Sequence, residues 1–175
     1  MKRVIRLALF VALASLPLAS SSMAGTASST FTVSTTVANN CTIAAANISF
    51  PNYDPIVTNA FNPLNQPSTV TVACTKGAVA TVTINTGSHP GAGGCATTRA
   101  MSGGGGNFLC YDIYQPGAGN VSATTQIWGT AGAAIYTYTS LGKAPVGLVD
   151  TGQIPGGQDV AALTYNDSVI ATINF

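Results

Sequence analysis

Residues 69–75 read Thr-Val-Thr-Val-Ala-Cys-Thr, and along this stretch apolar and polar side chains alternate. Successive side chains of an extended chain point to opposite faces, so Val70, Val72 and Cys74 share one face. The threonines occupy the other face. This pattern predicts a β-strand with one side against a hydrophobic core.

The same alternation recurs further along the chain. Residues 79–85 and 108–114 repeat it, and residues 134–139, 146–149 and 168–175 add shorter strands. The expected core-facing residues of the first two strands are Ala80, Val82, Ile84, Leu109, Tyr111 and Ile113. Turn residues separate the strands, as in Gly87-Ser88-His89-Pro90-Gly91. Short strands separated by such turns predict an all-β sandwich.

The N-terminus has the features of an export signal. Lys2, Arg3 and Arg6 precede the apolar run Leu7–Leu18, and Ser22-Met23-Ala24 supplies a cleavage site. The run is shorter than the roughly 20 residues that span a bilayer. We therefore expect residues 1–24 to be a signal peptide that is removed after Ala24, and the protein to be secreted.

Charge is sparse in the expected mature chain. Three basic residues stand against five aspartates, a net charge of −2, and there is no glutamate. Without a basic cluster the chain has no electrostatic footprint for nucleic acid. It also has no polybasic patch for a membrane surface. We therefore expect no nucleic-acid partner and no membrane insertion after signal removal.

All four cysteines lie in the expected mature chain, and an even number in an exported protein predicts two disulfides. Three pairings are possible, of which we favour Cys41–Cys74 and Cys95–Cys110. The second pair would enclose a glycine-rich loop over 102–107, and closing about 15 residues stabilises by roughly 3 kcal/mol in the chain-entropy model. The alternative, a zinc site, is disfavoured because there is no CxxC motif and His89 is the only histidine.

Candidate catalytic residues are few. His89 is the only histidine, and Ser88 beside it is no evidence of a triad, because triad members meet in space and not in sequence. Asp159 and Asp167 could form a carboxylate pair, although aspartates of this kind are more often turn and cap residues. We expect no enzymatic activity, no metal and no cofactor.

One segment does not fit a self-contained sandwich. Residues 25–30 are small and polar, and a strand-like alternation then begins at Phe31 and ends before Asn39. Its apolar-face positions are Phe31, Val33, Thr35 and Val37. The segment has two interpretations: an edge strand of its own domain, or a strand donated to the open sheet edge of a neighbour.

A set of motifs in order along the chain resembles the spore coat protein U domain family. The motifs are Cys74-Thr75-Lys76-Gly77, Asn85-Thr86-Gly87, Arg99-Ala100-Met101, Leu109-Cys110-Tyr111-Asp112-Ile113-Tyr114, Trp128-Gly129, Gly152-Gln153-Ile154-Pro155, Tyr165-Asn166-Asp167-Ser168-Val169 and Thr172-Ile173-Asn174-Phe175. They cover nearly the whole expected mature chain.

The resemblance implies an immunoglobulin-like β-sandwich that lacks its last strand, as in subunits of archaic, Csu-type chaperone–usher pili. It implies donor-strand complementation, in which a periplasmic chaperone fills the groove until the next subunit's N-terminal strand replaces it at an outer-membrane usher. The donor strand would map to Phe31, Val33, Thr35 and Val37. The expected domains are then a donor-strand extension over 25–38 and a spore coat U type sandwich over 39–175.

We therefore expect a structural subunit of a surface pilus, exported through the periplasm and supporting adhesion and biofilm formation. A spore-coat role is an alternative, because the family was named for one. A monomeric, secreted carbohydrate-binding sandwich is another. Aromatic side chains that could stack on sugars are Tyr114, Trp128, Tyr136 and Tyr138.

Overall fold

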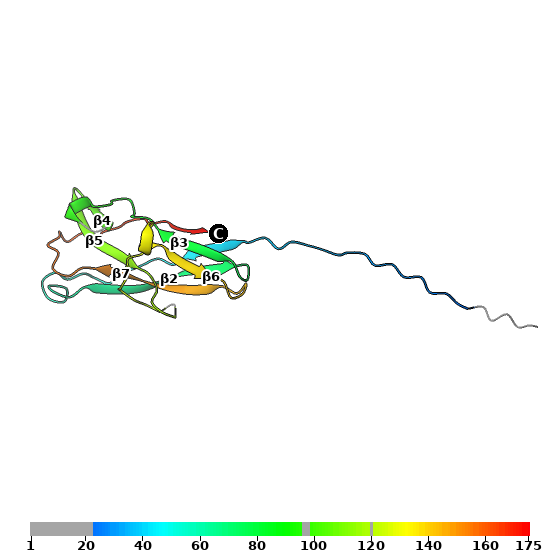
Figure 1. Ribbon diagram of the computed structural model, residues 1–175. Coiled ribbons are helices and arrows are strands. Elements are labelled where there is room, and N and C mark those ends of the chain that lie inside the picture. Colours follow the sequence, from blue (N-terminus) through cyan, green and yellow to red (C-terminus); the bar gives the residue numbers. More distant parts are fainter. Residues whose placement is uncertain (1–22, 96–98, 120) are drawn as a thin grey trace, which may run out of the picture. The chain divides into compact units, whose positions relative to one another are not determined.

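The computed structural model of the chain describes residues 23–95, 99–119 and 121–175 (Figure 1). The expected signal peptide, residues 1–24, lies outside the described residues except for its last two. The chain divides into two units, residues 1–36 and 37–175. Residues 23–36 of the first unit form no strand and are exposed. Every strand that the structure describes belongs to the second unit.

The larger sheet is antiparallel and has five strands. They are β1 (Cys41–Ala45), β2 (Leu64–Cys74), β4 (Arg99–Gly104), β5 (Asn107–Tyr114) and β7 (Val146–Ile154). Their order across the sheet is β1-β2-β7-β5-β4, which leaves β1 and β4 at its edges. The register places Cys41 opposite Cys74 and Val70 opposite Leu148.

The smaller sheet has three antiparallel strands. They are β3 (Val79–Ile84), β6 (Tyr136–Thr139) and β8 (Ala171–Asn174). β3 is central, and β6 and β8 pair with its two sides. Two 3-10 turns, Ala92–Gly94 and Gly132–Ala134, lie in the connections.

The core lies between the two sheets. Val70 and Val72 of β2 share one buried cluster with Ala80, Val82 and Ile84 of β3, so the sheets pack face to face. The inward residues expected on β5 are buried in the same cluster. The predicted all-β sandwich is therefore confirmed.

Two strands of the structure, β1 and β4, were not expected from the sequence. β4 covers residues 99–104, so the glycine-rich stretch 102–107 is not one loop. It ends β4 and begins β5, and the turn between them is Gly105-Gly106. The short strand β1 was not expected, because its five residues are half-buried or exposed and give little periodic signal. The strand-like segment 31–37 is not a strand in the structure.

Among the described residues, the structure contains no helix with the length and apolar character needed to cross a bilayer.

Candidate functional site: an open groove between two sheet edges

The sandwich is open between β1 and β8. The two strands lie side by side, each at the edge of a different sheet, and among the described strands no hydrogen-bond ladder joins them. A strand edge of this kind presents unpaired backbone groups to another chain. The two edges are therefore places where an additional strand can pair.

A groove of about 530 Å³ opens beside these edges. One wall is the chain that leaves β1, residues 45–50, and the other is the segment 165–171 that leads into β8. Its floor is made of core side chains, namely Val70, Ile84 and Ile113. We call this feature the open groove. It gives a ligand access to the hydrophobic core.

The apolar residues along the opening are incompletely covered. Ile43 of β1 and Ala171 and Ile173 of β8 are half-buried and pack against the core. Val169 and Phe175, on the same alternating face, are 37% and 54% exposed. Each large apolar side chain that becomes buried contributes about 1.5–3 kcal/mol. An inserted strand would therefore gain stability from covering this strip.

The polar groups at the open groove are arranged around Asp167, whose side chain is 2% exposed. Its Oδ2 accepts a hydrogen bond of 2.7 Å from the hydroxyl of Tyr111, and its Oδ1 accepts one of 2.9 Å from the backbone N–H of Ser88. Burial, followed by the hydrogen bond to Asp167, raises the pKa of Tyr111 well above its ordinary value. Tyr111 therefore stays protonated and acts as a donor.

A second buried carboxylate, Asp150 of β7, also lines the open groove and is 3% exposed. Burial raises its pKa from 3.8 to about 6. Among the described residues, its Oδ1 has no hydrogen-bond partner.

Arg99 is buried, and it does not line the open groove. Arg99 donates from Nε to the carbonyl of Asn85 at 2.9 Å, and from Nη2 to the carbonyls of Ile84 at 3.1 Å and Trp128 at 2.6 Å. Its Nη1 lies 3.8 Å from Oδ1 of Asp112. Burial lowers the pKa of Arg99. These bonds connect β4 to the end of β3 and to the segment of Trp128.

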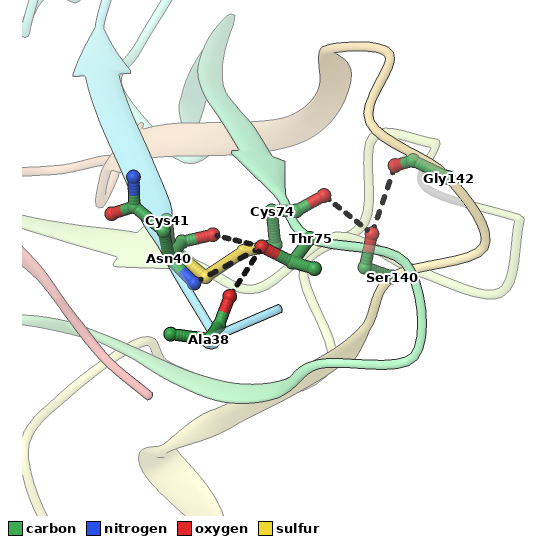
Figure 2. Close-up of a disulfide and its surroundings, with 7 residues drawn as sticks. All are labelled: Ala38, Asn40, Cys41, Cys74, Thr75, Ser140 and Gly142. Carbon is green, nitrogen blue, oxygen red and sulfur yellow. Dashed lines mark hydrogen bonds between the residues drawn. A yellow bond between two sulfur atoms is a disulfide. The ribbon is translucent and has the colours of Figure 1, made fainter. Parts of the chain in front are cut away.

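The disulfides pair Cys41 with Cys74 and Cys95 with Cys110, as favoured from the sequence. Figure 2 shows the first, at the start of β1. Beside it, the hydroxyl of Thr75 accepts the N–H of Asn40 at 3.1 Å and lies 3.2 Å from the carbonyl of Ala38, to which it donates. The backbone N–H of Thr75 donates to the carbonyl of Asn40 at 2.9 Å. The backbone bond extends the pairing of β1 with β2 to Asn40, and the Thr75 side chain also holds Ala38.

The expected donor-strand residues are exposed. Phe31, Val33 and Val37 are 87%, 84% and 75% exposed, and Thr35 is exposed as well. Large apolar side chains rarely gather on a short exposed segment without a binding role. The donor role itself remains a prediction.

The structure also shows where the sequence candidates for catalysis and for sugar binding lie. His89 lies 3.6 Å from Asp167, but Asp167 is already held by Tyr111 and Ser88, and Asp159 is exposed in another segment. Trp128 is fully buried and Tyr138 is 7% exposed, so neither presents a face for a sugar. Tyr136 packs on Trp128, and Tyr114 donates to Gln153 at 3.2 Å.

The buried charges Arg99, Asp112 and Asp150 were not singled out as site residues from the sequence. A signal was present for Asp150, because it alternates with Leu148 on an inward face. For Arg99 no local signal exists, since its partners lie 14 to 29 residues away in the chain.

Comparison with known proteins agrees with this architecture. Protein U of Myxococcus xanthus is 31% identical over 174 residues, which cover 94% of this chain and 93% of that protein. A chain of the crystal structure of the CsuC–CsuE chaperone–tip adhesion subunit pre-assembly complex, from archaic chaperone–usher Csu pili of Acinetobacter baumannii, matches with a TM-score of 0.54 at 25% identity. That match covers 80% of this chain and 41% of the other, so this chain spans less than half of its length. The Spore Coat Protein U domain model matches residues 27–172. The chain therefore belongs to the spore coat protein U domain family.

Proposed function

We propose that this chain is a structural subunit of a cell-surface pilus that polymerises by donor-strand complementation. The observation that carries the proposal is the sandwich left open between β1 and β8, in a chain whose alternating apolar segment 31–37 forms no strand of its own. Family membership and the likeness to a subunit complex of chaperone–usher pili support it.

In this proposal, residues 25–38 are the donor-strand extension and residues 39–175 are the acceptor domain. The donor segment of one subunit enters between β1 and β8 of the next and pairs with their free edges. The two strands have Cα atoms within 8 Å of each other, and they move apart to about 9–10 Å, twice the strand spacing, to admit it. Its inward positions, Phe31, Val33, Thr35 and Val37, then face the open groove. Such contacts are head to tail, and head-to-tail contacts that do not close produce filaments.

The remaining elements of the proposal concern partners and place. An unfilled groove is an aggregation hazard, so a periplasmic chaperone occupies it until an outer-membrane usher exchanges it for a donor strand. The expected signal peptide directs export, and the assembled pilus lies at the cell surface, where it supports adhesion and biofilm formation. The protein is not an enzyme and needs no cofactor.

The test uses purified chaperone–subunit complexes and reads polymers as ladders on an unboiled gel. Val33→Asp places a carboxylate where an apolar pocket is expected, so polymers should be lost while the chaperone complex still forms. The substitution forfeits about 1.5–3 kcal/mol of apolar burial and adds a desolvation cost of several kcal/mol. Thr32→Asp is the matched control, because residue 32 faces the opposite side of the strand and should assemble nearly normally.

Two results would contradict the proposal. If Val33→Asp prevents the chaperone complex from forming, the segment belongs to the core of its own domain. If Val33→Asp and Thr32→Asp polymerise equally well, the segment is not the donor.

A spore-coat component is the second candidate, favoured by the name of the matching family. Immunogold labelling separates the two, because a pilus subunit labels filaments and a coat component labels the spore surface. A monomeric binding module would be soluble alone, whereas the pilus subunit expressed without a chaperone should aggregate or oligomerise.

A further inference from the structure

Asp150 is an unusual residue for the inward face of β7, because it carries a carboxylate where the core is apolar. The inward residues of β7 are Leu148, Asp150, Gly152 and Ile154, and only one of them is polar. A carboxylate oxygen that is buried without a hydrogen bond is costly, and native folds rarely leave one so. Among the buried, unpartnered side-chain atoms of the described residues, only Oδ1 of Asp150 belongs to a residue that lines the open groove.

Neighbouring polar groups do not satisfy Asp150. Ser68 lies directly opposite it on β2, but the hydroxyl of Ser68 donates to the carbonyl of Ala46 at 3.1 Å. The hydroxyl of Tyr111, which also lines the open groove, donates to Asp167. These two donors are therefore engaged elsewhere, and Oδ1 of Asp150 has no hydrogen-bond partner among the described residues.

The proposed donor segment, residues 31–37, also has one polar residue on its inward face. Of its four inward positions, three are large and apolar, and the fourth is Thr35. A threonine buries less apolar surface than its neighbours, but its hydroxyl supplies one hydrogen-bond donor. The single donor on the inward face of this segment can thus partner the one buried, unpaired carboxylate oxygen of the open groove.

We propose that the open groove takes residues 31–37 of a second copy of this chain, and that the hydroxyl of Thr35 donates a hydrogen bond to Asp150. This inference rests on the proposed function. The pair sets both partner choice and register. A slip by two residues would bring Val33 or Val37 to the carboxylate and leave it unpaired, so one alignment is favoured over its neighbours.

A second copy fits better than the chain's own segment. Thr75 holds Asn40 and Ala38 beside the end of β2, as Figure 2 shows. The open groove is lined by Ala45 and Ala46, at the opposite end of β1 from Cys41. Because these bonds fix the chain as far as residue 38, residues 31–37 could run back along their own strand only if the chain reversed immediately before residue 38.

The experiment is a double-mutant cycle on strand exchange. A synthetic peptide of residues 25–39, with Thr35 or Thr35→Val, displaces the chaperone from complexes of the full subunit, with Asp150 or Asp150→Leu. On the Asp150 subunit, the Thr35→Val peptide should exchange about ten-fold or more slowly, the size of one hydrogen bond to a charged group. On Asp150→Leu it should exchange as fast as the Thr35 peptide or faster. A Thr35→Ser peptide, which keeps the hydroxyl, should retain most of the rate on Asp150.

The outcomes separate the two proposals. If the effects of Thr35→Val and Asp150→Leu simply multiply, the pairing is wrong although the donor-strand function stands. If the unsubstituted peptide does not exchange, or a Val33→Asp peptide exchanges equally well, the proposed function itself fails. If Asp150→Leu does not fold, Asp150→Asn replaces it. The ratio of the exchange rates of the Thr35 and Thr35→Val peptides must then become smaller, because a neutral amide without a partner costs less than a carboxylate without one. An unchanged ratio overturns the pairing.

Discussion

The hydroxyl of Tyr111 and the Oδ2 carboxylate oxygen of Asp167 are 2.7 Å apart, and this hydrogen bond ties β5 to the segment that leads into β8. Asp167 also binds the N–H of Ser88, so one carboxylate holds three parts of the chain together at one wall of the open groove. The wall keeps its shape because the buried charge is satisfied from two sides.

Tyr111→Phe should destabilise the fold, because it keeps the ring and removes one donor from the buried carboxylate. The free energy of unfolding should fall by about 1–3 kcal/mol in urea titrations. Tyr165→Phe is the control, since its hydroxyl donates to the carbonyl of Ala161 in an exposed setting. Equal losses in the two variants would show that the bond to Asp167 is not important for stability.

Gly87 is required next to the same carboxylate for two reasons. Its φ is +78°, and a Cβ built there would overlap the carboxylate of Asp167. Gly77 has a φ of +82° but open space around it, so Gly77→Ala measures the conformational cost alone, about 1–2 kcal/mol. Gly87→Ala should cost clearly more in the same urea titration, and should lose the protection of the Ser88 N–H in hydrogen exchange. A cost no greater than that of Gly77→Ala would contradict the close approach.

Arg99→Lys should destabilise the sandwich although it keeps the charge. Two nitrogens of the guanidinium reach three carbonyl oxygens, on Asn85, Ile84 and Trp128, whereas one ammonium cannot occupy those positions. We expect a loss of about 3–5 kcal/mol, the scale for a broken buried charge network, seen as a lower midpoint of thermal unfolding. Lys76→Met, at an exposed cation, is the control and should change the midpoint little. A midpoint for Arg99→Lys within that small range would mean that the guanidinium geometry does not matter.

The strands with clear alternation could be predicted from the sequence because their periodicity is local. Val70, Val82 and Ile113 face the core as the pattern requires. β4 was misjudged because glycines suggest turns, whereas here Gly103 lies so close to the ring of Tyr165 that a larger residue would collide. This constraint comes from a residue 62 positions later, and no local pattern contains it.

The site was less accessible to sequence reasoning than the strands. The alternating segment 31–37 was recognisable from its own pattern, and its donor role is a prediction from the family resemblance. The open groove was not, because its walls come from residues 45–50 and 165–171, which meet only in the fold. The buried charges were missed for the same reason, since burial of a charged side chain depends on distant partners. Asp150 is the exception, because its place between inward Leu148 and Gly152 already marks it as an inward charge.

The raised pKa of Asp150 makes stability depend on pH. In the folded chain burial raises this pKa to about 6, whereas 3.8 is the ordinary value. The folded state therefore binds the proton more tightly than the unfolded state. The contribution of Asp150 to stability is fully present below about pH 4 and is lost as the pH rises through 6. Each unit of pKa is worth about 1.4 kcal/mol, so the full effect is about 3 kcal/mol.

Asp150→Asn should abolish this dependence, because the amide is neutral at every pH and nearly the same shape. The free energy of unfolding of both chains is measured between pH 4.5 and 7.5, and the difference between the two chains should change with pH. The unsubstituted chain should gain on the variant by about 2 kcal/mol as the pH falls across this range, and the rest of the full effect lies below pH 4.5. Other titrating groups cancel in the difference, including Asp54, whose pKa is lowered by the N–H groups of Ile56 and Val57. A difference that stays flat, or one in which the unsubstituted chain gains as the pH rises, would show that the Asp150 carboxylate is hydrated or paired in solution. The open groove would then hold no unsatisfied charge for an incoming strand to meet.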